Sequence, residues 1–273
     1  MVVRPSLRLG LLGFWLLAVA HGDGQHPTAK AALVDALHGT QVSAVVLDWK
    51  TGKIVASFGA EPRARPGSAV KPLLLEYALE HGVVRPETTV YCRRSLHVAG
   101  RNLICTHPAT QPVMDAESAL AESCNTWFAE MARRMTPAQL EDALRAAHLQ
   151  HEPMMTADAD ARVLAVLGLQ SVEATPEQMA RSYRELLLRI PEDSVVARGL
   201  RDAVDYGMAN PARVPGVVVL GKTGTASEAG QAWTHGWFAG AVPGKMVLVV
   251  YVPHGDGGTA AGLAARFLRE VSR

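Results

Sequence analysis

Residues 235–252, HGWFAGAVPGKMVLVVYV, decide the fold because they predict two strands joined by a tight turn. Residues 235–242 and 246–252 are rich in aliphatic and aromatic side chains, which favour strands, and Gly244-Lys245 lies between them. One further strand is expected at residues 217–226, VVVLGKTGTA, and a closing helix at 259–271. The end of the chain therefore contributes three strands to a sheet.

The beginning of the chain shows the same strand pattern. Residues 42–48 and 53–58 flank the turn Lys50-Thr51-Gly52 and predict a hairpin, which a helix at 29–37 precedes. Because strands occupy both ends, we expect one antiparallel sheet built from residues 42–60 and 216–253, with helices on its faces.

The middle of the chain has helical periodicity instead. Thr136-Pro137-Ala138-Gln139 and Thr175-Pro176-Glu177-Gln178 each combine a cap, a first-turn proline and a glutamine that closes a capping box. We therefore expect an α/β (α+β) domain over residues 27–273, with a mostly helical insertion at about 72–207. A ligand cleft is expected between the sheet and this insertion.

The charge balance excludes some functions. The 273 residues carry a formal net charge of +1, and no block of like charges stands out. Nucleic-acid binding requires a concentrated basic face, so no nucleic acid is expected as a partner. A polybasic signal for anionic membranes is also missing.

Residues 1–20 predict an export signal. Arg4 and Arg8 precede an apolar run that ends in the small-residue pattern Ala18-Val19-Ala20. The run is shorter than the roughly 20 residues needed to span a bilayer. We expect cleavage and a periplasmic or extracellular location, with a retained membrane anchor as the alternative.

Export also permits disulfides. Cys92 and Cys105 flank a stretch with Gly100 near its middle, and a hairpin there would bring their sulfurs together. We predict a Cys92–Cys105 bridge, with two free buried thiols as the alternative, and interpret Cys124 as a small apolar side chain.

The histidines show no ligand spacing, so each is expected at the surface or in a loop, and neither a metal nor a cofactor is expected. They include His97, His107, His148 and His151.

Three short patterns contain groups suited to acyl transfer. In the first, Ser68-Ala69-Val70-Lys71 opens a helix, so Lys71 lies on the same face as Ser68. A lysine whose pKa is lowered by burial and by another cation can take the serine proton. The alternative is a helix cap followed by a solvent-exposed lysine.

The second and third patterns supply polar groups for a substrate. Ser123-Cys124-Asn125 falls between two helical stretches, where a hydroxyl could relay a proton and an amide could bind a substrate amide, or where both could simply cap a helix. Lys222-Thr223-Gly224-Thr225 lies on a predicted strand whose edge suits an extended peptide with a terminal carboxylate. An ordinary edge strand is the alternative.

Together, and in this order, the three patterns resemble those of penicillin-binding proteins and serine β-lactamases. The transpeptidase domain of penicillin-binding proteins is the more similar. Its nucleophile segment resembles Pro66-Gly67-Ser68, a helix before its third motif resembles residues 175–183, and its paired strands resemble residues 221–226 and 235–240. The resemblance runs from about residue 42 to the C-terminus and implies a five-stranded sheet with flanking helices.

The resemblance also implies roles in catalysis. Ser68 would be acylated, Lys71 would be its base, and Ser123 would pass a proton to the leaving amine. The backbone N–H groups of Ser68 and Thr225 would form the oxyanion hole, worth roughly 3 kcal/mol per donor.

Further residues would hold the substrate, which the resemblance identifies as D-Ala-D-Ala stem peptides of peptidoglycan or β-lactam antibiotics. Asn125 would bind the substrate backbone. Lys222 would tune the electrostatics of Lys71 and Ser123. Thr223 and Thr225 would hold the terminal carboxylate, and Gly224 between them would belong to the same substrate-binding strand. Cell-wall synthesis proteins are possible partners of such a domain.

Two alternative functions stay open. A class D-like serine β-lactamase would have a similar length, but that class usually has valine in place of Asn125, and its Tyr-Gly-Asn element is broken here after Tyr206-Gly207. Class A enzymes use a deacylating glutamate, for which only Glu152 is a candidate by position. A non-catalytic penicillin-binding sensor or accessory domain is the second alternative.

Overall fold

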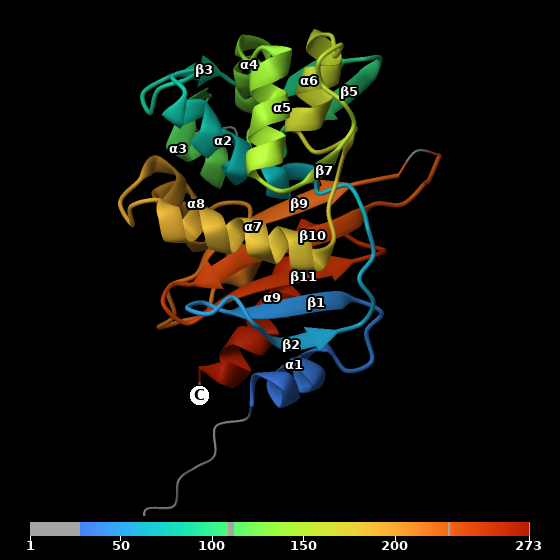
Figure 1. Ribbon diagram of the computed structural model, residues 1–273, viewed down its shortest axis with the longest axis vertical. Helices are drawn as coiled ribbons and strands as arrows, with labels where there is room; N and C mark the ends of the chain where they lie inside the picture. The colour runs from blue at the N-terminus through green and yellow to red at the C-terminus, as the bar shows by residue number, and fades with distance from the viewer. Residues whose placement is uncertain (1–27, 109–111, 229, 273) are drawn as a thin grey trace, which may run out of the picture.

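A five-stranded antiparallel sheet forms the centre of the molecule, in the order β2-β1-β11-β10-β9 (Figure 1). This computed structural model describes residues 28–108, 112–228 and 230–272. The strands are β1 (Ser43–Asp48), β2 (Ile54–Phe58), β9 (Leu220–Ala226), β10 (His235–Val242) and β11 (Met246–Val252). The predicted sheet, drawn from both ends of the chain, is confirmed.

Both faces of the sheet are covered, which explains why its central strands are apolar on both sides. Along β1, Val45 and Leu47 belong to one hydrophobic core, while Ala44 and Val46 belong to the other, as the period of two requires. Helices α1 (Ala29–Leu37) and α9 (Gly257–Val271) cover one face, and α7 (Pro176–Arg189) packs across the other (Figure 1).

The middle of the chain forms the predicted helical region above the sheet (Figure 1). Its helices are α2 (Lys71–Glu80), α3 (Ala116–Ala121), α4 (Asn125–Arg134), α5 (Pro137–Ala146), α6 (Ala159–Val166) and α8 (Val195–Asp205). The short helix η1 (Gly67–Val70) precedes α2, and η2 (Asn210–Ala212) follows α8 and packs against α9. The capping boxes predicted at Thr136 and Thr175 are both present and begin α5 and α7.

Small two-stranded ladders interrupt this helical region. They are β3 (Val90–Tyr91) with β6 (Val113–Met114), β4 (Ser95–Val98) with β5 (Arg101–Ile104), and β7 (Gln150–His151) with β8 (Val172–Glu173). The β4–β5 pair is the hairpin expected between Cys92 and Cys105, and Gly100 takes a left-handed φ of 73° in its turn.

The strand predicted at residues 217–226 begins later than expected. Val217 pairs only with Val214 in an isolated bridge next to the turn at Gly216, and Val218 is 56% exposed. Apolar composition alone made this segment resemble a buried strand.

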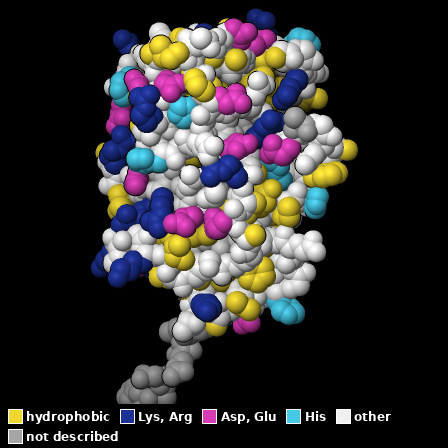
Figure 2. Space-filling model, turned by 45° about the vertical axis from the view of Figure 1, so that its right-hand side comes forward, with side chains coloured by type: hydrophobic (Ala, Val, Ile, Leu, Met, Phe, Trp, Pro, Cys, Tyr) yellow, Lys and Arg dark blue, Asp and Glu magenta, His cyan; other side chains and the backbone are white. Residues whose placement is uncertain are grey.

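Charges of both signs are interspersed with hydrophobic side chains on the face in Figure 2, in keeping with the small net charge. Within the described ranges, the helices are all too short or too polar to cross a membrane. The predicted export signal at residues 1–20 lies outside the described residues.

Candidate active site

The segment that carries Ser68 lies directly against strand β9. Gly67 has a φ of +53°, and a Cβ atom there would come within 2.5 Å of the carbonyl oxygen of Thr225. A Cβ on Gly224 would likewise lie 2.1 Å from the carbonyl oxygen of Pro66. Glycine is required at both positions, since any larger residue would push η1 away from β9. Two glycines therefore bring Ser68 next to Thr225.

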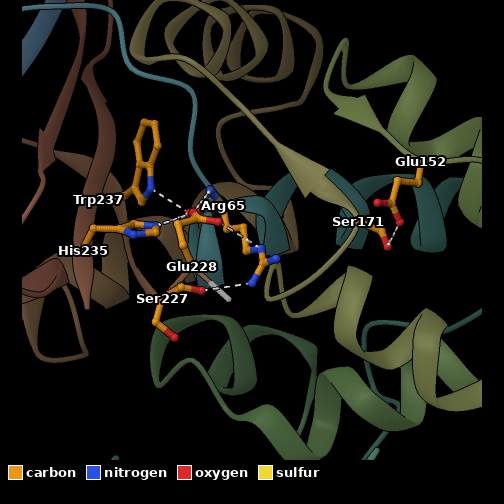
Figure 3. Close-up of polar contacts among 7 residues, drawn as sticks. All are labelled: Arg65, Glu152, Ser171, Ser227, Glu228, His235 and Trp237. Carbon is orange, nitrogen blue, oxygen red and sulfur yellow. Dashed lines mark hydrogen bonds and ion pairs between the residues drawn. The ribbon is translucent and has the colours of Figure 1, made fainter. Parts of the chain in front are cut away.

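Arg65 fastens the loop before Ser68 to the sheet (Figure 3). Its carbonyl oxygen accepts hydrogen bonds from Nε1 of Trp237 at 2.9 Å and Nε2 of His235 at 2.8 Å, both on β10. Its guanidinium donates to the carbonyl of Ser227 at 3.1 Å and pairs with Glu228 at 3.4 Å. These contacts fix the approach of the chain to the nucleophile position.

Lys71 is fully buried at the start of α2. Its Nζ donates to the carbonyl oxygen of Ser123 at 2.9 Å and to Oδ1 of Asn125 at 2.9 Å, and it lies 3.3 Å from Oγ of Ser123. Burial lowers the pKa of Lys71 from 10.5 to about 8. The first and second sequence patterns therefore meet at an amine that gives up its proton more readily than a free lysine.

The turn at residues 122–124, named the Ser123 turn, is held in an uncommon conformation. Ser123 has a φ of 56°, which non-glycine residues rarely adopt. Asn125 begins α4, and its Nδ2 donates to the carbonyl of Ile104 at 3.3 Å. The Ser123 turn is thus attached to Lys71 on one side and to the β4–β5 hairpin on the other.

Lys222 on β9 is the second fully buried amine. Burial first, and then the charge of Lys71, hold the pKa of Lys222 well below its usual value. The two lysines therefore lie close enough to influence each other's ionisation.

A cleft of about 600 Å³ joins the three patterns at the surface. Its lining includes most of the predicted site residues, namely Ser68, Ser123, Asn125, Thr223, Gly224 and Thr225. Lys71 and Lys222 are buried beside it. A hollow of about 710 Å³ near α8 is larger, but none of its lining residues is a predicted site residue.

The two threonines of β9 differ in their freedom to bind a ligand. Oγ1 of Thr223 donates to the carbonyl of Met208 at 3.3 Å, and the residue is only 7% exposed. Thr225 is exposed, and its Oγ1 accepts the backbone N–H of Gly257 at 3.0 Å. Thr225 is therefore the better placed of the two to meet a carboxylate.

The cleft also contains residues that the sequence patterns did not identify, namely Ile104, Thr106, Met208, Pro211, Asp256, Gly257 and Gly258. Asp256 caps α9 by accepting from the N–H of Thr259. A Cβ on Gly257 would lie 2.6 Å from Cβ of Thr223, so this helix begins in contact with β9. The Asp256-Gly257-Gly258 sequence could have indicated this site, because it combines a helix-capping residue with two small residues that permit close packing.

Glu152 lies elsewhere. It accepts a 2.5 Å hydrogen bond from Ser171 and lines a separate cavity of about 200 Å³ with Arg65 and Gln150. Figure 3 shows the Glu152–Ser171 pair away from the contacts of Arg65 with β10. The position of Glu152 therefore does not favour a deacylating role.

The cysteine and histidine predictions need correction. Cys92, Cys105 and Cys124 are all free thiols in the structure, so the expected Cys92–Cys105 bridge is absent. His107, expected at the surface or in a loop, lies in the loop after β5, but it is only 1% exposed. The hairpin does bring Cys92 and Cys105 to one place, but Cys124 and His107 lie there as well, which no pairwise spacing could indicate.

The fold and the converging patterns define a domain of the β-lactamase-like class. The sequence matches the penicillin binding protein transpeptidase domain over residues 42–188 and 193–272. The chain therefore belongs to the penicillin-binding protein transpeptidase family. The comparison with curated proteins found no match.

Solved structures of transpeptidase domains share this fold. The D,D-transpeptidase domain of a peptidoglycan glycosyltransferase from Eggerthella lenta aligns with a TM-score of 0.77 at 19% identity, covering 89% of this chain and 80% of that one. The transpeptidase domain of Burkholderia pseudomallei penicillin-binding protein 3 gives 0.75 at 18% identity, with 89% and 91% covered. Pseudomonas aeruginosa PBP2, solved with the compound WCK 5153, gives 0.72 at 18%, with 88% and 72% covered.

Proposed function

We propose that this transpeptidase domain is an exported serine D,D-acyltransferase that forms an acyl-enzyme on Ser68. Its substrates would be D-Ala-D-Ala stem peptides of peptidoglycan, and it would bind β-lactams covalently at the same serine. The observation that carries the proposal is the buried amine of Lys71, which begins the helix after Ser68 and contacts both Ser123 and Asn125.

In the first half-reaction, Oγ of Ser68 attacks the carbonyl carbon of the penultimate D-alanine while its proton passes to the neutral Nζ of Lys71. The N–H groups of Ser68 and Thr225 stabilise the oxyanion that develops. The peptide C–N bond then breaks. Ser123, 3.3 Å from Nζ of Lys71, returns the proton to the leaving amine of the terminal D-alanine.

The second half-reaction decides the product. An amine from another stem peptide gives a cross-link, and water gives a shortened peptide. In both cases the acceptor loses a proton to Lys71 and Ser68 leaves with one, so the enzyme returns to its starting state. Glu152 lines a different cavity, so its carboxylate is not placed to activate a water molecule at the acyl-enzyme. We therefore expect hydrolysis of the acyl-enzyme to be slow.

The substrate carboxylate would bind at the end of the cleft formed by β9 and α9. Thr225 offers its hydroxyl, and Gly257 and Gly258 begin α9, whose N-terminal end favours negative charge. Asn125 would bind the peptide backbone. Export follows from the leader-like residues 1–20, and the N-terminal sequence of the mature protein tests it.

Labelling with a fluorescent penicillin, followed over time, tests the proposal. Wild-type protein should gain a covalent label that persists, and Ser68→Ala should gain none. Rapid loss of the label with turnover of nitrocefin would instead indicate a β-lactamase. Absence of label on wild-type protein would indicate a non-catalytic binding domain.

A further inference from the structure

All three cysteines of the chain meet at one buried point together with His107. The three Sγ atoms and a ring nitrogen of His107 all lie within 4.8 Å of one another. Every one of the four residues is buried, at 2% exposure or less. They come from separate places in the sequence: Cys92 follows β3, Cys105 follows β5, and Cys124 precedes α4.

The spacing of these atoms suits a tetrahedral zinc ion. With Zn–S bonds of about 2.3 Å and Zn–N bonds of about 2.0 Å, neighbouring ligand atoms lie about 3.5 to 3.8 Å apart. Sγ of Cys92 lies 3.4 Å from Nε2 of His107. Small shifts of the remaining side chains would complete the tetrahedron, and three thiolates with one imidazole form a common structural zinc ligand set.

The surroundings of His107 orient its ring for metal binding. Its Nδ1 lies 2.9 Å from the carbonyl of Pro108 and 3.2 Å from Nη1 of Arg94. When Nδ1 donates its proton to Pro108, the lone pair of Nε2 faces the sulfurs, which is the usual arrangement of a metal-binding histidine. The guanidinium of Arg94 would then offset the negative charge of the site, since three thiolates exceed the charge of Zn²⁺ by one.

Thr126 completes the polar environment. Its Oγ1 lies 3.6 Å from Sγ of Cys92 and 3.7 Å from Sγ of Cys105, so its hydroxyl can donate to one of the two thiolates. A disulfide would use only two of the three sulfurs and would give no reason for a buried, oriented histidine beside them.

We propose that Cys92, Cys105, His107 and Cys124 bind one Zn²⁺ ion. Its ligands belong to two elements of the candidate active site. Cys124 stands between Ser123 and Asn125, and Cys105 follows Ile104, whose carbonyl accepts from Asn125. The ion would join the Ser123 turn to the β4–β5 hairpin and so hold both residues in place around Lys71. The four ligands act as positioning residues for acylation.

The zinc site itself is tested by measuring the metal content with inductively coupled plasma mass spectrometry. Full-length mature protein, reduced and then incubated with Zn²⁺ and desalted, should hold about one zinc per chain. His107→Ala and Cys105→Ser should lose it, whereas the matched control His97→Ala, an exposed histidine of the same hairpin, should keep it. Thr126→Val should keep the site but weaken zinc binding about 10- to 100-fold.

Cobalt provides a readout that does not depend on variants that fold. Co²⁺ in the wild-type protein should give the intense visible bands of a tetrahedral thiolate site, and Zn²⁺ should displace it. Three results would overturn the proposal. They are wild-type protein that lacks stoichiometric zinc, a cobalt spectrum typical of octahedral coordination, and a disulfide among these cysteines that persists after reduction.

The effect of zinc on the acylation rate is tested by comparing the wild-type protein with and without metal. Wild-type protein stripped of metal under reducing conditions should react more slowly with penicillin, and added Zn²⁺ should restore the rate. An unchanged rate would refute the positioning role. Because metal content is measured without penicillin, failure of the zinc site and failure of the proposed acyltransferase activity can be told apart.

Discussion

The buried amine of Lys71 donates a 2.9 Å hydrogen bond to the amide oxygen of Asn125, which lies 54 residues further along the chain. This contact joins the helix that follows the nucleophile to the turn that carries Ser123. Since Lys71 is desolvated and held in place, it is the group on which the proposed chemistry depends most.

Replacing Lys71 tests its role as the base. Lys71→Arg keeps a positive charge but cannot release a proton, so the rate of acylation by penicillin should fall about 10²- to 10⁴-fold. The control is Lys245→Arg, in the exposed β10–β11 turn, which should leave the rate unchanged. Stopped-flow measurement with a fluorescent penicillin decides, and normal acylation by Lys71→Arg would rule out the base.

The pH dependence of acylation follows from the lowered pKa of Lys71, which is about 8. Only the neutral amine accepts the proton of Ser68, and the amine becomes neutral as the pH rises through its pKa. The acylation rate should therefore increase from pH 6 to about 8 and level off above it. A profile that is flat across this range, or one that falls, would contradict the assignment.

The contact between η1 and β9 predicts the effect of a single methyl group. Gly67→Ala places a Cβ within 2.5 Å of the Thr225 carbonyl at a φ of +53°. Gly82→Ala is the matched control, because Gly82 has a φ of +65° with open space around its Cβ position. Both should lose about 1 to 2 kcal/mol for the backbone conformation, but only Gly67→Ala should lose more stability and also lose acylation.

Thermal unfolding and penicillin labelling of the two glycine variants provide the comparison. Equal destabilisation of both proteins, with labelling intact, would mean that the close approach of Gly67 to Thr225 is not needed.

Tyr183 contacts the segment that carries Ser68 through a buried hydrogen bond. Its buried hydroxyl donates to the carbonyl of Ala69 at 2.7 Å. Tyr183→Phe would leave that carbonyl without this donor in a buried site, at a cost of about 1 to 3 kcal/mol. Tyr206→Phe, which removes an exposed hydroxyl bonded to Asp202, should cost little. Chemical denaturation measures both, and equal losses would argue against the support from Tyr183.

The hydroxyl of Thr225 should contribute to binding more than to chemistry. Thr225→Val keeps the shape of the side chain but removes the acceptor for the N–H of Gly257 and a donor for the substrate carboxylate. We expect weaker binding of a D-Ala-D-Ala peptide, seen as a raised KM with a smaller change in kcat. A normal KM would place the carboxylate elsewhere.

Local patterns were sufficient to predict much of this structure. The strands of the sheet were recognisable from apolar runs bounded by turns, and the capping boxes at Thr136 and Thr175 identified the first residues of two helices. The short range of these signals explains their success, because caps and turns depend on residues only a few positions apart.

Contacts between distant segments were harder to predict. The grouping of Cys124 and His107 with the hairpin cysteines depends on tertiary packing, and no spacing in the sequence indicates it. Met208 and Pro211 enter the cleft only because the chain after α8 folds back toward β9. Val218 misled the strand prediction because a short apolar run looks the same in an exposed loop and in a buried strand.

The role of Ser68 as the nucleophile is tested decisively by locating the penicillin adduct with peptide mass spectrometry. We expect one penicilloyl group per chain, attached to the peptide that contains Ser68, and none in Ser68→Ala. An adduct on any other residue, or the same adduct in Ser68→Ala, would contradict it.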